Sequence, residues 1–380
     1  MPILSSTSRN TTPSRIWWSV PYLYFLGLIT IILPVIYLSQ AAWTTILPYI
    51  YLVVSITLLD GVFGRETRNS QDLEHDKFFD YVAWGLIPLH YIFYFAAIFI
   101  ITTVEFPFWA VLLMALGIGF YNGNLITIGH ELGHRHDKLN QFWAKIALAL
   151  PTYGHFTLEH NRGHHVRVAT PEDPASARLG ENVYRFAMRD MIGNIKGGWA
   201  FEKARLAKKD LPVWHYKNSI LQVNLAGLAI TLGLIAICGW HVLPFIILHH
   251  YFCWFSLSLV NYIEHYGLKR AKRANGKYEP CKPRHSWNAN QRISNLITLN
   301  LQRHSDHHFA PAKPYQSLHD HQDAPYLPAG YPLCMMMAGC PALWFYIMDK
   351  KVMAWAEGDL SKTNLAPQAR GRYEKRYSPA

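Results

Sequence analysis

Four long windows without a single charged residue limit the folds open to this chain more than any other feature. The windows are 16–59, 81–104, 106–130 and 218–263. A helix crosses the hydrocarbon layer of a bilayer, which is about 30 Å thick, in roughly 20 residues. The two middle windows each fit one crossing, and the outer two are long enough for a pair joined by a tight turn. We therefore predict an all-α integral membrane protein rather than a soluble enzyme.

Polar or helix-breaking residues divide the two long windows into pairs. Ser39-Gln40 interrupts the first window, and the stretch from Gly239 to Pro244 interrupts the last. The alternative interpretation is that the windows are buried helices of a soluble protein. Such helices usually run only about 10–14 apolar residues, so windows of this length argue against it. The six predicted membrane spans are 16–38, 42–59, 81–103, 107–129, 219–239 and 242–263.

The basic residues predict an orientation. The chain has 36 Lys and Arg against 25 Asp and Glu, a formal net charge of +11. With six spans, every Lys and Arg, including Arg9 and Arg15 before the first span, falls on one side of the membrane. Cytoplasmic loops are rich in Lys and Arg, so both termini are expected in the cytoplasm. Because orientation in a lipid bilayer explains the positive charge, we expect no nucleic-acid binding.

The spans also predict how the chain is organised. A six-helix transmembrane bundle would occupy 1–263, interrupted by a cytoplasmic segment at 130–218. A cytoplasmic cap would follow at 264–360, and a loosely ordered polar tail at 361–380. The five cysteines include no CxxC pair, so no cysteine-ligated metal site is indicated.

Histidines form four tight clusters that all fall at or beyond the same membrane boundary. The clusters are HELGH at 130–134, EHNRGHH at 159–165, NYIEHYG at 261–267 and LQRHSDHH at 301–308. Residues i and i+4 share a face of a helix, so His130 and His134 can reach one metal ion. Nine clustered imidazoles exceed the needs of one ion, whereas two ions with four or five ligands each would use them all. The sequence therefore predicts a His-rich cytoplasmic cap that holds two metal ions.

The metal is inferred from context. Imidazole suits zinc, copper, iron and nickel. HELGH matches the HExxH helix of zinc proteases, with Glu131 as general base, but one zinc ion needs only three protein ligands and water. That alternative leaves most of the clustered histidines unexplained. A transporter is disfavoured because its polar sites would lie at mid-membrane. Iron, which performs oxygen chemistry on lipid-soluble substrates, is the first choice.

The histidine spacings HxxxH, HxxxHH and HxxHH resemble those of the integral-membrane di-iron desaturases and hydroxylases. More specifically, NYIEHYGL at 261–268 and LQRHSDHH at 301–308 resemble the bacterial alkane 1-monooxygenases. The resemblance covers roughly residues 20–360. Six further segments are similar to that family: LLDGVFG at 58–64, YGHF at 153–156, VATPED at 168–173, HSWNAN at 285–290, YQSL at 315–318 and GYP at 330–332.

This resemblance implies a rubredoxin-dependent enzyme of the bacterial inner membrane that uses O₂ to convert medium-chain n-alkanes to 1-alkanols. Electrons would pass from NAD(P)H through a rubredoxin reductase and rubredoxin to two non-haem iron ions. An aromatic-methyl hydroxylase and a fatty-acyl desaturase remain alternatives within the same metal class. The implied iron ligands are His130, His134, His160, His164, His165, His265, His304, His307 and His308.

Acidic residues beside the ligands have two interpretations. A metal-bound imidazole usually donates its other N–H to a carboxylate or carbonyl, and we predict this supporting role. The alternative is ordinary charge on a helix surface. The candidates are Glu131, Glu159, Glu264 and Asp306, of which Glu264 and Asp306 are the strongest.

Bulky residues on the second and fourth spans are predicted to line a substrate channel and to set the chain length. They are Leu52, Ile56, Phe120 and Tyr121. On the fourth span, Gly119 and Gly123 have the small-xxx-small spacing that lets helices approach closely. Tight packing is the ordinary interpretation of these glycines, and room for a substrate chain is the alternative.

Two polar features lie outside the clusters. His90, His249 and His250 fall inside the predicted spans, where we expect hydrogen bonds between helices. A basic surface on the segment after the fourth span could meet anionic lipid headgroups or steer an acidic rubredoxin. Its residues are Arg185, Arg189, Lys203, Arg205, Lys208 and Lys209.

Overall fold

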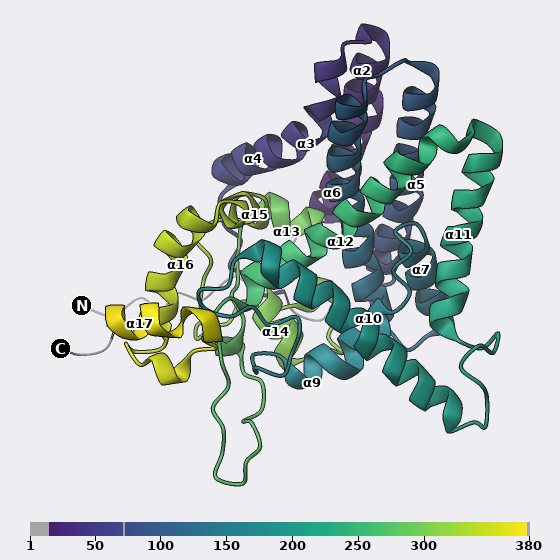
Figure 1. Ribbon diagram of the computed structural model, residues 1–380. Helices are drawn as coiled ribbons and strands as arrows, with labels where there is room; N and C mark the ends of the chain where they lie inside the picture. Colours follow the sequence, from purple (N-terminus) through teal and green to yellow (C-terminus); the bar gives the residue numbers. More distant parts are fainter. Residues whose placement is uncertain (1–14, 71–72, 378–380) are drawn as a thin grey trace.

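The computed structural model describes residues 15–70 and 73–377, so Arg9 lies outside the described part. The described residues form no β-strand beyond isolated bridges, which confirms the all-α prediction. Figure 1 shows the helices as a bundle joined to a cap. They are α1 (Val20–Gly27), α2 (Leu33–Ser39), α3 (Leu47–Ile50), α4 (Ile56–Phe63), α5 (Phe78–Thr103), α6 (Phe108–Gly133), α7 (Lys138–Ala149), α8 (Phe156–Glu159), α9 (His165–Arg167), α10 (Val183–Ala207), α11 (Ser219–Cys238), α12 (Leu243–His265), α13 (Arg292–Ile297), α14 (His304–Phe309), α15 (Tyr331–Gly339), α16 (Pro341–Trp355) and α17 (Arg370–Tyr377).

Six helical segments of the described chain are long and apolar enough to cross a membrane, as predicted. Several extend past the predicted ends, because backbone hydrogen bonding continues where the apolar side chains stop. The fourth and sixth therefore carry Glu131 and Glu264 into the cap. The segments are Arg15–Ser39, Ala42–Phe63, Phe78–Thr103, Phe108–Gly133, Ser219–Cys238 and Trp240–His265.

Helices α6 and α12 form the tightly packed centre of the bundle. A Cβ atom on Gly119 would lie 2.6 Å from Phe252 Cβ, and one on Gly123 would lie 1.8 Å from Ser256 Oγ. Any larger residue would force the two helices apart, so the packing interpretation of these glycines is confirmed. Gly123 also borders a cavity, described below.

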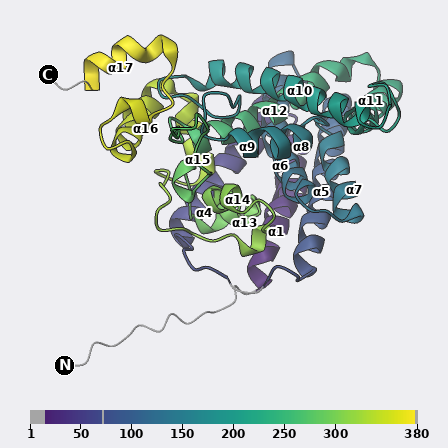
Figure 2. The ribbon, with the colours of Figure 1, turned by 90° about the horizontal axis from the view of Figure 1, so that it is seen from below.

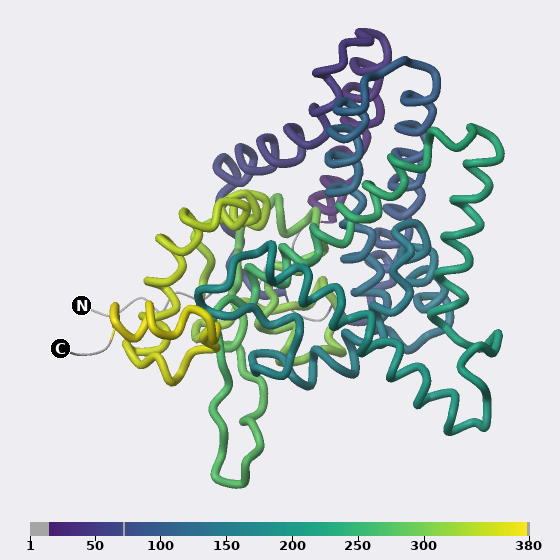
Figure 3. Tube along the Cα trace, in the orientation of Figure 1, coloured from purple at the N-terminus to yellow at the C-terminus, as the bar shows by residue number. Residues whose placement is uncertain are grey.

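The first half of the second span packs against α6, and its second half leans away from the bundle and packs against α15. It runs from α3 through a π-turn at Tyr51–Ser55 into α4, and Figure 3 shows it leaning away from the first span. Helix α15 contacts both the π-turn and α4. Residues of the second span, α6, α12 and α15 line an apolar cavity, described below.

One apolar feature of the cap was not predicted from the sequence. Helices α15 and α16 are bent by 118° at their junction and together are apolar enough for a broken span or a re-entrant pair. Leu343 and Tyr346 on α16 expose large apolar side chains. Residues 324–348 are also uncharged, but Pro332 and Pro341 hide the helical signal because each begins a new helix.

The expectation of a loosely ordered tail is wrong for residues 361–377. Tyr373 on α17 is buried, and its Oη donates a hydrogen bond of 2.5 Å to Asp349. The backbone N–H of Asn364 donates to the carbonyl of Gly267, two residues beyond the ligand candidate His265. Because buried contacts hold it, the tail is part of the cap.

A hydrogen-bonded chain of buried polar side chains crosses the bundle. His90 on α5 approaches Asn122 on α6 at 2.9 Å, and Asn122 approaches His249 on α12 at 3.0 Å. His250 lies 3.2 Å from His249 and 3.1 Å from Thr152 Oγ1. The expected interhelical role is thus confirmed for His90 and His249, whereas His250 joins α12 to the turn after α7.

We predict that Asn122→Leu lowers the free energy of unfolding by about 1–2 kcal/mol, because hydrogen bonds between membrane helices average ~0.6 kcal/mol and two would be lost. Chemical unfolding in detergent micelles measures it. Thr231→Val is the matched control, since Thr231 Oγ1 bonds only to Gly227 O within α11. A variant as stable as the wild type would contradict the prediction.

Candidate metal centre

The nine clustered histidines meet in the cap and divide into two groups. Within each group the candidate donor atoms all lie within 4.8 Å of one another. The groups touch, because the rings of His165 and His308 are 4.5 Å apart between centroids. We call the first set, His130, His134, His160, His165 and His307, the five-histidine group, and the second set, His164, His265, His304 and His308, the four-histidine group.

Helix ends and short helices supply every member. His130 and His134 come from the end of α6, and His265 ends α12. The remaining members come from the α8–α9 segment and from α14, which are separated widely in sequence. Figure 2 looks at these short helices from below, where α8, α9 and α14 lie in the same region of the cap.

A π-turn at His160–His164 places the α8–α9 histidines. In a regular α-helix, residues five positions apart point about 140° away from each other. The wider π-turn, with hydrogen bonds from i to i+5, brings such residues nearer to one side. His160 Nε2 accordingly lies 2.9 Å from His165 Nε2, while His164 turns to the four-histidine group.

Helix α14 supplies histidines to both groups, and buried polar contacts hold it in place. His304 and His308, four residues apart, join the four-histidine group, and His307 joins the other. Asn288, in the segment HSWNAN, accepts a hydrogen bond from the backbone N–H of Ser305. The Arg303 guanidinium donates to the carbonyls of Leu318, Glu66 and Arg68, which ties α14 to two loops. The sequence alone did not single out either residue.

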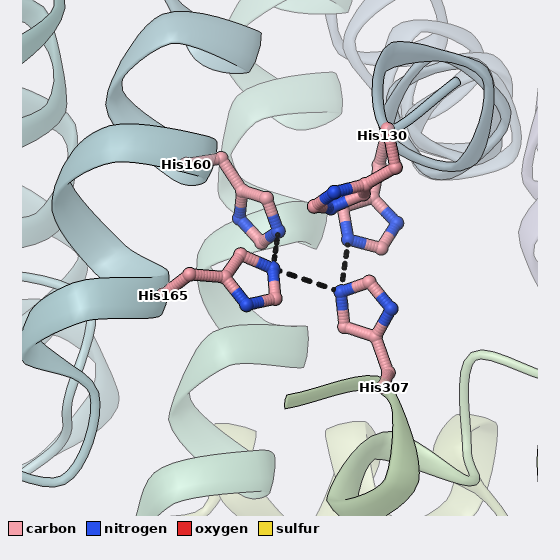
Figure 4. Close-up of side chains that lie close together, drawn as sticks. His130, His160, His165 and His307 are labelled. Carbon is pink, nitrogen blue, oxygen red and sulfur yellow. Dashed lines mark hydrogen bonds between the residues drawn. The ribbon is translucent and has the colours of Figure 1, made fainter. Parts of the chain in front are cut away.

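The Nε2 atoms of the five-histidine group lie too close together for hydrogen bonds alone to satisfy all of them. His307 Nε2 lies 2.9 Å from His130 Nε2 and 3.0 Å from His165 Nε2, as Figure 4 shows. One ring nitrogen carries either a proton or a lone pair, so it cannot pair with both. His134 Nε2 is buried without any hydrogen-bond partner among the described residues.

A metal ion explains this convergence. With metal–imidazole bonds of about 2.1 Å, two donors at a right angle lie about 3.0 Å apart. Neighbouring Nε2 atoms of the four-histidine group show this spacing: 3.2 Å for His164–His308, 3.1 Å for His265–His304 and 2.9 Å for His304–His308. The residues present therefore fit two metal ions, one for each group.

Burial keeps most of these imidazoles neutral, which is the form that binds metals. It lowers the pKa of His134 to about 3 and holds those of His160 and His307 well below the ordinary value. His164 differs. Burial opposes its protonation, yet the charge and hydrogen bond of Asp173 raise the pKa of His164 above the ordinary value.

Asp173 is the supporting carboxylate that the sequence analysis missed. Its Oδ2 lies 2.8 Å from His164 Nδ1 and also accepts a hydrogen bond of 2.6 Å from Ser176 Oγ. This contact orients the ring so that Nε2 faces the other ligands. Asp173 ends the VATPED segment, nine residues from His164, so no helical spacing pointed to it.

Three of the four predicted supporting carboxylates are paired with cations instead. In the described part of the chain, no hydrogen bond joins Glu131, Glu159 or Asp306 to a ligand imidazole. Their ion pairs are Glu131–Arg135 at 2.9 Å, Glu159–Arg167 at 2.6 Å and Asp306–Lys313 at 2.8 Å. Glu264 alone approaches a ligand, with Oε2 3.2 Å from His304 Nε2.

An apolar cavity of about 90 Å³ lies along α6 and α12. All four predicted channel residues line it, and their role in binding substrate stays a prediction. Thr127 lines the cavity one helical turn before His130. Its full lining includes Tyr49, Leu52, Val53, Ile56, Phe120, Tyr121, Gly123, Asn124, Thr127, Ser256, Leu257, Val260, Ser294, Ile297, Thr298, Tyr331, Pro332, Met335 and Met336.

We predict that Asp173→Asn weakens metal binding about 10–100-fold, because the support of His164 loses its charge. Titration of the metal-free protein with a divalent ion measures this affinity. Glu181→Gln is the control, since Glu181 is equally buried but pairs with Arg189. Equal affinities of Asp173→Asn and the wild type would refute the role of Asp173.

Comparisons with known proteins agree with this site. Residues 107–337 match the fatty acid desaturase family. The chain is 40% identical to the alkane 1-monooxygenase of Pseudomonas putida over 346 residues, which covers 90% of this chain and 84% of that protein. Alkane 1-monooxygenase 1 of Alcanivorax borkumensis is 40% identical over 327 residues, covering 85% and 81%.

A more distant relative is the xylene/toluene monooxygenase hydroxylase component of Pseudomonas putida. It is 25% identical over 234 residues, which covers 60% of this chain and 61% of that protein. The match to the desaturase family spans all four histidine clusters. The chain belongs to the alkane 1-monooxygenases, within the fatty acid desaturase family.

Proposed function

We propose that this protein hydroxylates the terminal methyl group of medium-chain n-alkanes to 1-alkanols, with O₂ and a di-iron centre held by the nine histidines. The observations that carry this proposal are the two histidine groups and an apolar cavity lined by the same two helices, α6 and α12, that carry His130 and His265. The names of the similar monooxygenases support the same reaction.

Iron is the metal we assign because of the substrate. A saturated methyl group has no polarised bond and no acidic proton, so acid–base and nucleophilic routes have nothing to act on. When bound, the iron supplies the oxidising chemistry with O₂ that the side chains lack. The neutral imidazoles hold the ions in place and leave open positions for ligands from solution.

The cavity residues orient the substrate. Its walls are mostly aliphatic and aromatic, so each buried CH₂ group of an alkane contributes about 0.8 kcal/mol to binding. Thr127 and Tyr331 mark the end nearest the histidines. A linear chain that enters end-on brings its terminal carbon there first, which favours oxidation at that carbon.

The orientation in the membrane and the electron supply are parts of the same proposal. The positions of Lys and Arg favour placing the cap and both termini on the cytoplasmic side of a bacterial inner membrane. Reduced rubredoxin, supplied by a reductase and NAD(P)H, would dock on the basic surface. Arg189 and Arg205 of that surface pair with Glu181 and Glu202. The exposed members without an ion pair in the described chain are Arg185, Lys203, Lys208 and Lys209.

The comparisons also support two other substrates for the same centre. The xylene/toluene monooxygenase relative supports hydroxylation of aromatic methyl groups. The desaturase family match supports oxidation of a fatty acyl chain. Both alternatives differ from our proposal in the substrate that the cavity would admit.

Reconstitution tests the function. The full chain, loaded with ferrous iron, receives rubredoxin, its reductase, NADH and a ladder of n-alkanes. We expect 1-alkanols, identified by mass, and no turnover without iron or rubredoxin. An alkene product, or faster oxidation of p-xylene than of any alkane, would overturn the proposal.

We predict that Ala at Leu52, Ile56, Phe120 or Tyr121 extends the longest accepted alkane, because each substitution enlarges the cavity. Product profiles across the alkane ladder measure the limit. Leu58→Ala is the control, since Leu58 is 64% exposed on α4 and does not line the cavity. Unchanged profiles in all four variants would remove these residues from the channel.

A further inference from the structure

Helix α10 carries an apolar stripe that the rest of the described chain leaves exposed. Its residues, Tyr184, Met188, Ile192 and Ile195, are spaced four, four and three positions apart, which places them on one face of the helix. Their exposed fractions are 53%, 55%, 46% and 43%. Exposed apolar surface that is contiguous in this way marks a contact with another protein or with a membrane.

The other faces of α10 show which of these contacts the stripe makes. One face packs against α8 and α12, and it includes the buried residues Phe186, Asp190 and Asn194. Arg185 and Lys196 are exposed, and the helical repeat places them beside the apolar stripe rather than within it. Helix α10 thus has a protein-facing side, an apolar side and a basic side. A helix that lies in the surface of a membrane has an apolar side and a basic side of this kind.

The first turn of α10 adjoins the lipid-facing surface of a membrane span. The ring of Tyr184 stacks on Phe255 of α12 with centroids 6.1 Å apart, and Phe255 stacks on Tyr251 at 5.9 Å. Tyr251 and Ile247 are 42% and 59% exposed on this span, which is the surface that acyl chains cover. Because the row of aromatic rings is continuous, the stripe begins where lipid already lies against α12.

The other end of α10 leads into a membrane span. A link at 208–218 joins α10 to α11. In this link Trp214 and Tyr216 are 73% and 74% exposed, and Trp214 contacts Trp199 of α10 with ring centroids 5.4 Å apart. Tryptophan and tyrosine gather at the boundary between membrane and water. Both ends of α10 are therefore tied to the membrane, and Figure 2 shows the helix along one edge of the molecule, between α16 and α11.

The bend between α15 and α16 extends the same apolar surface. Tyr184 Oη donates a hydrogen bond of 2.7 Å to the carbonyl of Gly339 at this bend. Met336, Leu343 and Tyr346, on either side of the bend, are 47%, 42% and 64% exposed. These two helices are also apolar enough to form a re-entrant pair. We call the α10 stripe and these three residues together the α10–α16 surface.

We propose that the α10–α16 surface is inserted into the lipid leaflet on the side of the cap. Its apolar side chains lie among the acyl chains, and Arg185 and Lys196 lie at anionic headgroups. A second copy of the chain is disfavoured as the occupant, because the surface continues the lipid-facing side of α12. The assignment depends neither on the reaction nor on the metal. Lys208 and Lys209, which follow the end of α10, remain available to an acidic partner.

Met336 connects this surface with the cavity. Its side chain is exposed on α15 and also lines the cavity. Helix α15 is the helix that packs against the second half of the second span. With the α10–α16 surface in the leaflet, acyl chains lie against this part of the cavity wall.

Spin labels test the insertion, because they report the surroundings of single residues in a membrane. The full-length chain, with its three cysteines that are not buried changed to serine, carries one label through Ile192→Cys, Leu343→Cys or Asn275→Cys. Asn275 is the control, since it is exposed in the loop 270–282, which points away from the spans in Figure 1. The vesicles contain phosphatidylethanolamine and phosphatidylglycerol. Oxygen, which concentrates among acyl chains, should relax the labels at 192 and 343 more than a water-soluble nickel chelate does, and the label at 275 should show the reverse.

Three results would overturn the proposal. Labels at 192 and 343 that respond to the nickel chelate as strongly as the label at 275 would place the surface in water. Labels that respond to neither reagent would show that protein covers the surface, as in a dimer. A response typical of lipid at only one of the two positions would contradict the joint insertion of α10 and the α15–α16 bend.

A charge-removal pair tests the contact with headgroups. Arg185→Gln/Lys196→Gln removes two charges beside the stripe, and the matched control, Arg273→Gln/Lys277→Gln, removes two exposed charges from the loop 270–282. The wild type and the control should melt at a higher temperature in nanodiscs of phosphatidylglycerol than in nanodiscs of phosphatidylcholine. The first variant should lose at least about half of that difference, because its cations no longer meet anionic headgroups. An equal difference in all three proteins would overturn the assignment of Arg185 and Lys196.

Discussion

The structure depends on the convergence of nine imidazoles where the membrane helices enter the cap. Each of these rings has to point a nitrogen into a small space shared with several others, and burial keeps most of them neutral. Such an arrangement is unfavourable on its own, because ring nitrogens spaced at 2.9–3.2 Å cannot all be satisfied by hydrogen bonds. Metal ions satisfy them together. The long spans, the π-turn before α9 and the short α14 are means of holding these rings within reach of two ions.

The histidines lie where the bundle meets the cap because an apolar substrate and polar metal ligands need different surroundings. The apolar cavity lies between membrane helices, where a hydrocarbon substrate partitions, whereas the ligands come from helix ends and polar segments. The glycines of α6 bring its backbone against α12, and those two helices deliver both the cavity wall and three of the ligands. Tyr331 belongs to both parts, since its ring contacts the cavity and its hydroxyl contacts Glu264. Tyr331 thus connects the cavity wall to the residue that precedes the ligand candidate His265.

Much of this arrangement was predictable from local pattern. Uncharged windows predicted six spans because bilayer thickness sets their length, and the histidine spacings predicted a shared site because four clusters lay at one boundary. The errors arose where contacts between residues far apart in the sequence decide the local structure. Asp349 and Gly267 order the tail, and Pro332 and Pro341 hide the α15–α16 pair from a search for continuous helices. Asp173 escaped notice because a loop, not a helical period, brings it to His164.

The sequence by itself determined the membrane class, the number of spans and the identity of the nine histidines, because these follow from composition and spacing along the chain. Only the tertiary structure decided how the histidines divide into groups of five and four, because the π-turn directs His160 and His164 to different groups. It also decided which carboxylates meet a cation and which meet an imidazole. Glu131, Glu159 and Asp306 look equivalent to Glu264 in sequence, yet each meets an Arg or Lys, and Glu264 meets a ligand instead. A charged group takes its role from its neighbours in space, and those neighbours are set by folding.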